Sequence, residues 1–212
     1  MQRSQEATED ISQRILAPKT VVVIGAATGG PAALAGIVPK LPRSFPAAII
    51  IVQQMRPGFT RLLANYLSSP SGAIVEEAQN HQAIRPNQIL MAPGNQGLIV
   101  TRTSMPDNPY AITLEDQSDS MAKARARIDA AMQSASEVFS SRTIGVLLTG
   151  MGSDGRDGMK AIRDQGGTTI AQDQDSSILF DMPKSAIDSG VVDEILPLWT
   201  IADRLVELVG DN

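Results

Sequence analysis

The sequence predicts an α/β fold in which a doubly wound, mainly parallel sheet carries helices on both faces and is interrupted by an antiparallel hairpin excursion. Short, wholly apolar runs alternate with segments of helical period, a pattern typical of a parallel sheet with helices on both faces. Glycine-rich or polar residues follow three of these runs, at residues 25–30, 53–58 and 149–155. Ligands of an open parallel sheet bind at the carboxyl ends of its strands, so we expect function in these three segments.

The N-terminal part of the chain begins with polar residues 1–19, which we interpret as a tail or the remnant of a linker before one domain over residues 20–212. Residues 21–24 and 48–52 predict two buried strands, because both are runs of Val, Ile and Ala. A helix is expected between them, with an inner face formed by Leu34, Ile37, Val38 and Leu41. Residues 59–67 predict a second amphipathic helix after a Pro-Gly turn.

The middle of the chain has four short apolar segments separated by turns rich in Pro, Asn and Gly. These segments are residues 74–78, 89–92, 98–101 and 110–114. We assign all four to the antiparallel excursion, since short strands with such turns are typical of hairpins. A long helical pattern over residues 122–139 follows.

The C-terminal part returns to the alternation of strands and helices. The predicted strands are residues 143–148, 168–171 and 191–196, the last at an edge or at the end of the sheet. The predicted helices are residues 158–165, 183–189 and 201–209.

The amino-acid composition of the chain argues against several classes of function. The 212 residues carry a net charge of −5, which argues against nucleic acid as the main partner. The absence of Cys excludes a thiolate nucleophile, and a single His nearly excludes a His-built metal site, so we expect neither metal nor cofactor. No apolar run is long enough to span a bilayer and no signal peptide opens the chain, so we expect a cytoplasmic protein without membrane insertion.

The turn after the first strand, residues 25–30 (GAATGG), is the most informative motif. The pattern Gly-x-Ala-x-Gly has the shape of a nucleophile elbow, with Ala27 where the serine would stand. A phosphate-binding loop is a second interpretation, but Gln53 and Gln54 occupy the end of the next strand, where an acid would bind a ribose. A plain glycine turn is the third.

Three other polar positions have simpler explanations. Asp154, in the segment after the strand at 143–148, is able to orient a base or to cap the helix that follows. Asp173 and Asp175 are more typical of a turn than of a cation site, because no third acid accompanies them. His81 lies in a polar stretch that predicts a surface loop.

Six ordered blocks in residues 20–209 together resemble the catalytic domain of the chemotaxis receptor methylesterase, CheB. They are residues 24–31 (IGAATGGP), 52–60 (VQQMRPGFT), 91–94 (MAPG), 147–155 (LLTGMGSDG), 169–173 (TIAQD) and 182–187 (MPKSAI). The resemblance implies a doubly wound α/β domain that hydrolyses γ-glutamyl methyl esters on receptor cytoplasmic helices and deamidates receptor glutamines. The family's receiver domain is absent from the 212 residues, which fits a trimmed chain and a natural single domain equally.

The resemblance also implies a Ser-His-Asp triad, whose three members fall on Ala27, Gln54 and Asp154. Thr28 matches a threonine beside the nucleophile, and Met151 matches a residue whose backbone N–H lies near the oxyanion. Alanine has no nucleophilic atom and glutamine is no base near neutral pH, so the triad chemistry lacks two of its members. We expect the Gln54 amide to replace the lost imidazole as a donor to the Asp154 carboxylate.

We therefore predict a catalytically inactive methylesterase domain that acts by binding a protein, either chemoreceptor cytoplasmic helices or another signalling protein. Recognition of receptor helices is itself in doubt, because residues 124–129 keep only Arg125 and Asp129 of a family segment near the substrate cleft, and Arg56 replaces a usual proline. An active esterase or deamidase is the alternative if Ala27 is engineered or if other residues substitute. A small-molecule or nucleotide sensor that reuses the glycine-rich turns is the second alternative.

Overall fold

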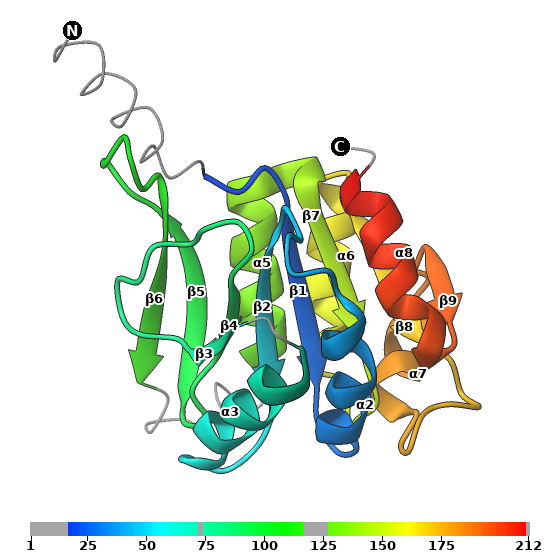
Figure 1. Cartoon of the computed structure of the whole chain (residues 1–212). Helices are drawn as coiled ribbons and strands as arrows, with labels where there is room; N and C mark the ends of the chain where they lie inside the picture. The colour runs from blue at the N-terminus through cyan, green and yellow to red at the C-terminus, as the bar shows by residue number, and fades with distance from the viewer. Residues whose placement is uncertain (1–16, 72–73, 117–126, 211–212) are drawn as a thin grey trace, which may run out of the picture.

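A seven-stranded, wholly parallel sheet forms the centre of the structure, a computed structural model that describes residues 17–71, 74–116 and 127–210 (Figure 1). Its strand order is β3-β4-β2-β1-β7-β8-β9. These strands are β1 (Val21–Ala26), β2 (Ala48–Gln53), β3 (Val75–Glu77), β4 (Ile89–Met91), β7 (Thr143–Leu147), β8 (Thr168–Gln172) and β9 (Glu194–Leu196). A separate antiparallel pair is formed by β5 (Gln96–Arg102) and β6 (Tyr110–Asp116).

Helices cover both faces of the sheet (Figure 1). They are α2 (Gly30–Ile37), α3 (Phe59–Ser71), α5 (Arg127–Phe139), α6 (Arg156–Asp164), α7 (Asp181–Asp188) and α8 (Leu198–Gly210), with 3₁₀ turns η1 (Val38–Lys40) and η2 (Ser140–Arg142). The helix expected over residues 122–139 is α5 from Arg127 onward, and residues 122–126 lie outside the described residues. No helix in the described part of the chain is long and apolar enough to cross a membrane.

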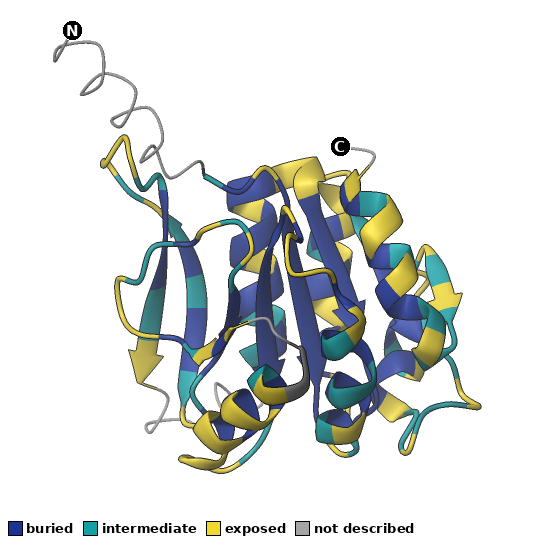
Figure 2. Ribbon diagram, viewed as in Figure 1, coloured by how far each residue is buried: buried dark blue, intermediate teal, exposed yellow. Residues whose placement is uncertain are grey.

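Two hydrophobic clusters, one on each face of the sheet, make up the core. The first joins the sheet to α2, α3 and α8, and the second joins it to α5, α6, α7 and the β5–β6 pair. Successive residues of a strand enter opposite clusters, as Val22 and Val23 of β1 do. All residues of β1, β2 and β7 are therefore buried, which explains why their sequences are continuous apolar runs (Figure 2).

The sheet changes winding direction at β1. This strand pairs in parallel with β2 on one side and with β7 on the other. The chain therefore adds strands first on the β2 side and, after β7, on the β8 side. Diverging connections at such a switch point leave a crevice at the carboxyl ends of the strands. The loops after β1, β2 and β7 meet at this crevice.

The antiparallel excursion is smaller than the sequence indicated. Among the strands of the described residues, β5 and β6 alone pair antiparallel, whereas β3 and β4, which cover most of the predicted strands at 74–78 and 89–92, belong to the main parallel sheet. The assignment of these two strands to the hairpin was wrong. All three residues of β4 are buried, which fits a strand with neighbours on both sides, and strand length and turn composition did not reveal this.

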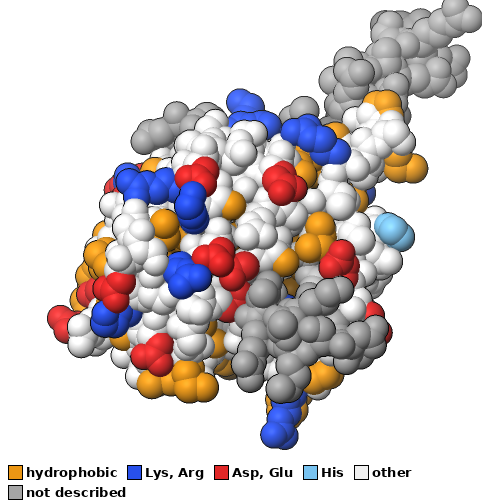
Figure 3. Space-filling view, turned by 180° about the vertical axis from the view of Figure 1, so that it is seen from behind, with side chains coloured by type: hydrophobic (Ala, Val, Ile, Leu, Met, Phe, Trp, Pro, Cys, Tyr) orange, Lys and Arg blue, Asp and Glu red, His pale blue; other side chains and the backbone are white. Residues whose placement is uncertain are grey.

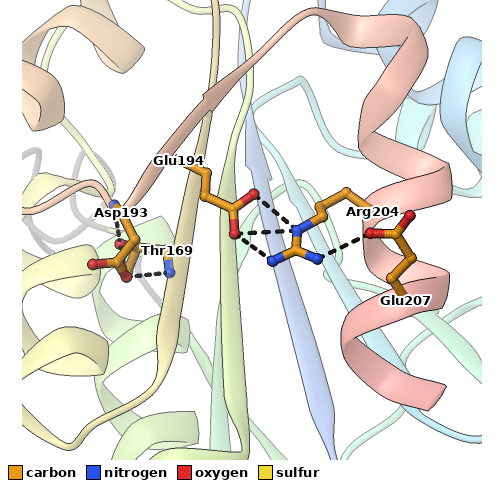
Figure 4. Close-up of polar contacts among 5 residues, drawn as sticks. All are labelled: Thr169, Asp193, Glu194, Arg204 and Glu207. Atoms are coloured by element: carbon orange, nitrogen blue, oxygen red, sulfur yellow. Dashed lines mark hydrogen bonds and ion pairs between the residues drawn. The ribbon is translucent and has the colours of Figure 1, made fainter. Parts of the chain in front are cut away.

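The edge strand β9 is fixed by polar contacts to the elements beside it (Figure 4). The Asp193 carboxylate accepts hydrogen bonds from the backbone N–H and the hydroxyl of Thr169, at 2.9 and 2.8 Å. The Arg204 guanidinium on α8 binds Glu194 at 2.8 Å and Glu207 at 2.9 Å. These contacts join the last strand to β8 and to the closing helix.

Candidate functional site

Backbone hydrogen bonds hold the loops after β1, β2 and β7 together at the crevice. The Ala27 N–H donates to the Thr149 carbonyl at 3.1 Å, and the Gln54 N–H donates to the Ala26 carbonyl at 2.9 Å. Ala27 is buried, with 7% of its surface exposed, and its side chain ends in a methyl group. The position that the resemblance assigns to a nucleophile therefore lies where the three loops meet and presents no reactive atom.

Gln54 and Asp154 are in direct contact across this crevice. The Gln54 Nε2 atom donates to Asp154 Oδ2 at 2.5 Å, so the predicted contact between the amide and the carboxylate is confirmed. Asp154 also accepts hydrogen bonds from the backbone N–H groups of Ile128, at 3.0 Å, and Asp129, at 2.9 Å. These N–H groups belong to the first turn of α5, where orphan donors meet a carboxylate favourably. Asp154 thus joins the loops after β2 and β7 to α5.

The Asp154 carboxyl is only 8% exposed, and burial raises its pKa to about 6. The nearby charge of Asp129 raises this pKa further, while the hydrogen bonds from the two backbone N–H groups and from Gln54 lower it. Burial also raises the pKa of Asp129, whose carboxylate accepts from the Gly155 and Gly158 N–H groups at 2.9 and 2.7 Å. The site is therefore a pair of partly desolvated carboxyls.

Gln53, directly before Gln54, holds the turn that contains Ala27 through its side chain. It is 3% exposed, and its Nε2 atom donates to the Ala27 carbonyl at 2.8 Å. A Cβ atom at Gly30 would lie 1.9 Å from Gln53 Oε1, so only glycine allows this close approach of α2 to β2. In the sequence, Gln53 stands where an acid would bind a ribose, and its position before a second glutamine does not predict a supporting role.

Thr149 is a second supporting residue that the sequence analysis did not single out. Its hydroxyl lies 3.0 Å from the carbonyl oxygens of both Thr28 and Leu179, and it accepts a hydrogen bond from the Leu179 N–H at 2.9 Å. The residue is 1% exposed. Through this hydroxyl, the loop that precedes α7 is bound to the turn that contains Ala27.

Thr28 and Met151 lie at the open side of the crevice. Thr28 is exposed, and 67% of the Met151 surface is exposed. Beside Met151 there is a hollow of about 470 Å³, lined by Gln54, Asp154 and the residues between Met151 and Asp154. The backbone N–H groups of Thr28 and Met151 have no acceptor within the described residues. The crevice therefore has open space beside Met151 and two backbone N–H groups without an acceptor among the described residues, and no imidazole lies in it.

The other sequence candidates lie apart from this crevice. His81 is exposed on the connection from β3 to β4, as predicted for a surface loop (Figure 3). Its backbone N–H donates to the Ile112 carbonyl at 2.8 Å. Asp173 accepts from the N–H of Ser176 at 3.1 Å and so closes a turn, again as predicted. Arg125 lies outside the described residues. Within the part of the chain that is described, no cluster of three His, Asp or Glu side chains is placed to hold a metal ion.

Comparisons with known proteins agree on one family. A family model described as CheB methylesterase matches residues 22–205. A protein-glutamate methylesterase/protein-glutamine glutaminase of Thermotoga maritima is 41% identical over 189 residues, which are 89% of this chain and 54% of that relative. A protein of the same description from Carboxydothermus hydrogenoformans is 44% identical over 187 residues, 88% of this chain and 54% of the relative. The chain thus spans about half the length of these relatives.

A solved structure extends the likeness to three dimensions. The crystal structure of the Thermotoga maritima CheB methylesterase catalytic domain is similar to this structure with a TM-score of 0.84 and 40% sequence identity. The match covers 89% of this chain and 98% of the solved chain. The half of the relatives that this chain matches therefore corresponds to a catalytic domain.

Proposed function

The chain belongs to the CheB methylesterase family, and from this we propose that it is a signalling domain of the chemotaxis type that has lost ester hydrolysis and acts by binding a protein. The fold, the crevice and one carboxylate of the expected triad are present. At two positions, Ala27 and Gln54, the side chains do not suit the hydrolysis of an ester.

The contact between Gln54 and Asp154 is the observation that carries the proposal. Ester hydrolysis by a triad needs a hydroxyl oxygen to attack the carbonyl and an imidazole to accept its proton. Here the Ala27 methyl group replaces the hydroxyl, and the Gln54 NH₂ group, which has no basic lone pair, occupies the donor position toward Asp154. Loss of a triad nucleophile or base lowers turnover by roughly 10⁶, so the remaining donors do not sustain an enzyme's rate.

The nearby hydroxyl groups do not replace the missing parts. Thr28 is adjacent to Ala27, but the only imidazole of the chain belongs to His81, on the connection from β3 to β4. The Asp154 carboxylate accepts hydrogen bonds from three N–H donors. Among the described residues, no hydroxyl group donates to it. We therefore propose that the crevice binds a protein, either a chemoreceptor or another signalling protein. The domain that we propose is cytoplasmic.

Restoration of the triad tests this proposal. We expect no hydrolysis of an activated carboxylic ester or of methylated receptor by the unmodified protein, and measurable hydrolysis by the double variant Ala27→Ser with Gln54→His. Each single variant is the matched control, because each still lacks one triad member. Turnover by the unmodified protein that Asp154→Asn abolishes would refute the proposal. A folded double variant without activity would contradict the expectation that the two replaced side chains alone account for the loss of hydrolysis.

A further inference from the structure

The Asp154 carboxylate accepts hydrogen bonds from three groups, and one of them is able to change from donor to acceptor. Its Oδ2 atom accepts from the Ile128 N–H at 3.0 Å and from Gln54 Nε2 at 2.5 Å, and its Oδ1 atom accepts from the Asp129 N–H at 2.9 Å. A backbone N–H donates in every state, whereas a glutamine amide has a donor end and an acceptor end. Of these three neighbours, only Gln54 therefore adapts to a change at the carboxyl.

The Gln54 backbone is fixed, but the end of its side chain is not. The Gln54 N–H donates to the Ala26 carbonyl at 2.9 Å, and the Gln54 carbonyl accepts from Gln53 Nε2 at 3.1 Å. The side chain is half-buried and lines the hollow of about 470 Å³, and its Oε1 atom accepts no hydrogen bond from a described residue. Because the last torsion of a glutamine is broad and roughly two-fold, a half turn exchanges the amide oxygen and nitrogen in place.

A proton on Asp154 makes the present contact with Gln54 unfavourable. The neighbours of the carboxyl all donate, so a proton on Oδ2 faces the Gln54 NH₂ group and finds no acceptor there. After a half turn of the amide, the Asp154 O–H donates to Gln54 Oε1 instead. The separation of 2.5 Å between the two side chains is within the range of an O–H···O hydrogen bond. Reversal thus keeps the contact and turns the NH₂ group away from Asp154.

We infer that the Gln54 amide reverses when Asp154 takes up a proton, so that the crevice exchanges a hydrogen-bond acceptor for a donor. This inference rests on the proposed function, because it describes how the proposed binding crevice is regulated. When Asp154 is ionised, its charge and the Gln54 amide oxygen both oppose an anion in the hollow that they line. When Asp154 is protonated, that charge is absent and the Gln54 NH₂ group is a donor beside Met151, which lines the same hollow. The protonated crevice therefore prefers an anion.

The charges around Asp154 favour uptake of this proton near pH 6. Burial raises the pKa of Asp154 to about 6, and the charge of Asp129 raises it further. Arg127 is close enough for Asp154 to raise its pKa, whereas Arg156 and Asp157 of α6 are exposed and paired with each other at 2.9 Å. The loop after β1 has no titratable side chain at residues 27–29, and the loop after β2 contributes the exposed cation of Arg56.

The other place for the proton is between the carboxyls of Asp154 and Asp129. A hydrogen bond from the Asp154 side chain lowers the pKa of Asp129, so the two groups lie close together. The Asp129 Oδ1 atom already accepts from the Gly155 and Gly158 N–H groups, at 2.9 and 2.7 Å. The Gln54 Oε1 atom accepts no such bond, which favours Gln54 as the acceptor. A proton shared with Asp129 would leave the amide in its present orientation.

Nuclear magnetic resonance of the Gln54 NH₂ group between pH 4.5 and 7.5 tests the reversal. Gln54→Met identifies the two proton signals by their loss. At pH 7.5 we expect one of them downfield, bonded to the carboxylate, and at pH 5 both at the positions of exposed glutamine amides. Asp154→Asn should abolish this change, and the exposed Asp175→Asn is the matched control that should retain it. Gln54 signals that stay constant, whether or not the Asp154 carboxyl carbon titrates, would overturn the inference.

Nitrate, an anion that does not titrate in this range, tests the consequence for binding. We expect it to shift the Met151 N–H signal and to bind about tenfold more tightly at pH 5 than at pH 7.5. Gln54→Met should lose most of this gain, and Asp175→Asn should keep it. Equal binding at both pH values, no binding at pH 5, or a gain that Gln54→Met retains in full would contradict the exchange of acceptor for donor.

Thermal unfolding of each variant shows whether it is folded. Ester hydrolysis measured on the same preparations separates the inference from the proposed function. Hydrolysis together with reversal of the amide refutes catalytic silence alone, and silence with an amide that does not reverse refutes the reversal alone.

Discussion

Replacing the Asp154 carboxyl with an amide should remove much of the pH dependence of folding stability between pH 4 and pH 7. The carboxyl is 8% exposed, and burial raises its pKa from an ordinary 3.8 to about 6. Its charged neighbours are Asp129, whose negative charge also raises this pKa, and Arg127, whose pKa is lowered by burial and raised by Asp154. In the variant Asp154→Asn the group at this position does not titrate.

The direction follows from which state holds the proton. Between pH 4 and pH 6 the folded chain keeps the Asp154 proton, which the unfolded chain has already released, so stability from this group falls as pH rises. Its contribution is complete below the unfolded pKa and is lost above the folded one. A difference of about two pH units corresponds to about 3 kcal/mol of unfolding free energy. The raised pKa of Asp129 acts in the same direction.

Urea denaturation at a series of pH values from 4 to 7.5 measures this effect in both proteins. Other carboxyls titrate in both, so the difference between the two curves reports Asp154 together with the change that its loss causes in the neighbouring Asp129. We expect the unmodified protein to lose about 3 kcal/mol more than Asp154→Asn over this range. The exposed Asp175→Asn is the control and should follow the unmodified protein. Parallel curves for Asp154→Asn and the unmodified protein would refute the assignment of a raised pKa to this carboxyl.

Substitutions at three further positions test contacts that hold the fold together. Thr149→Val should cost about 1–3 kcal/mol by leaving the Leu179 N–H without its acceptor, and Thr149→Ser should restore most of the loss in a denaturation curve. Phe139→Ala should cost about 3–5 kcal/mol, because the ring is 1% exposed and stacks on Tyr110 with centroids 4.4 Å apart; a smaller loss would indicate that the core collapses into the space. Arg204→Ala should lower the melting temperature less than Phe139→Ala does, and a larger effect would contradict the view that this partly buried ion pair only fixes the sheet edge.

Strands buried on both faces were the easiest elements to predict. The strands β1, β2 and β7 are continuous apolar runs, and the structure places them at the centre of the sheet within one or two residues of the expected bounds. The strands β3 and β4 are three residues long and lie among turns, so their sequences also suit a hairpin. Their place in the parallel sheet depends on which strand each one pairs with, and three residues contain too little periodicity to specify it.

The triad positions were predicted by resemblance, and the residues that support them were not. Gln54 and Asp154 follow different strands, yet the carboxyl ends of parallel strands meet at one edge, so their contact was expected. Gln53 and Thr149 gave no signal, because a single buried amide at the end of a strand, or a single buried hydroxyl in a loop, has no periodicity and its partners are distant in sequence.

The sequence by itself determined the fold class, the core strands, the family resemblance and the absence of a serine and a histidine at the triad positions. These follow from residue identity and from local periodicity, which the chain carries without reference to its folded state. Only the tertiary structure decided the raised pKa of Asp154, the pairing of β3 with β4 and the exposure of Phe59, Leu62 and Tyr66 on α3. Each of these depends on which distant segments lie side by side, since desolvation, strand pairing and burial are properties of neighbours in space.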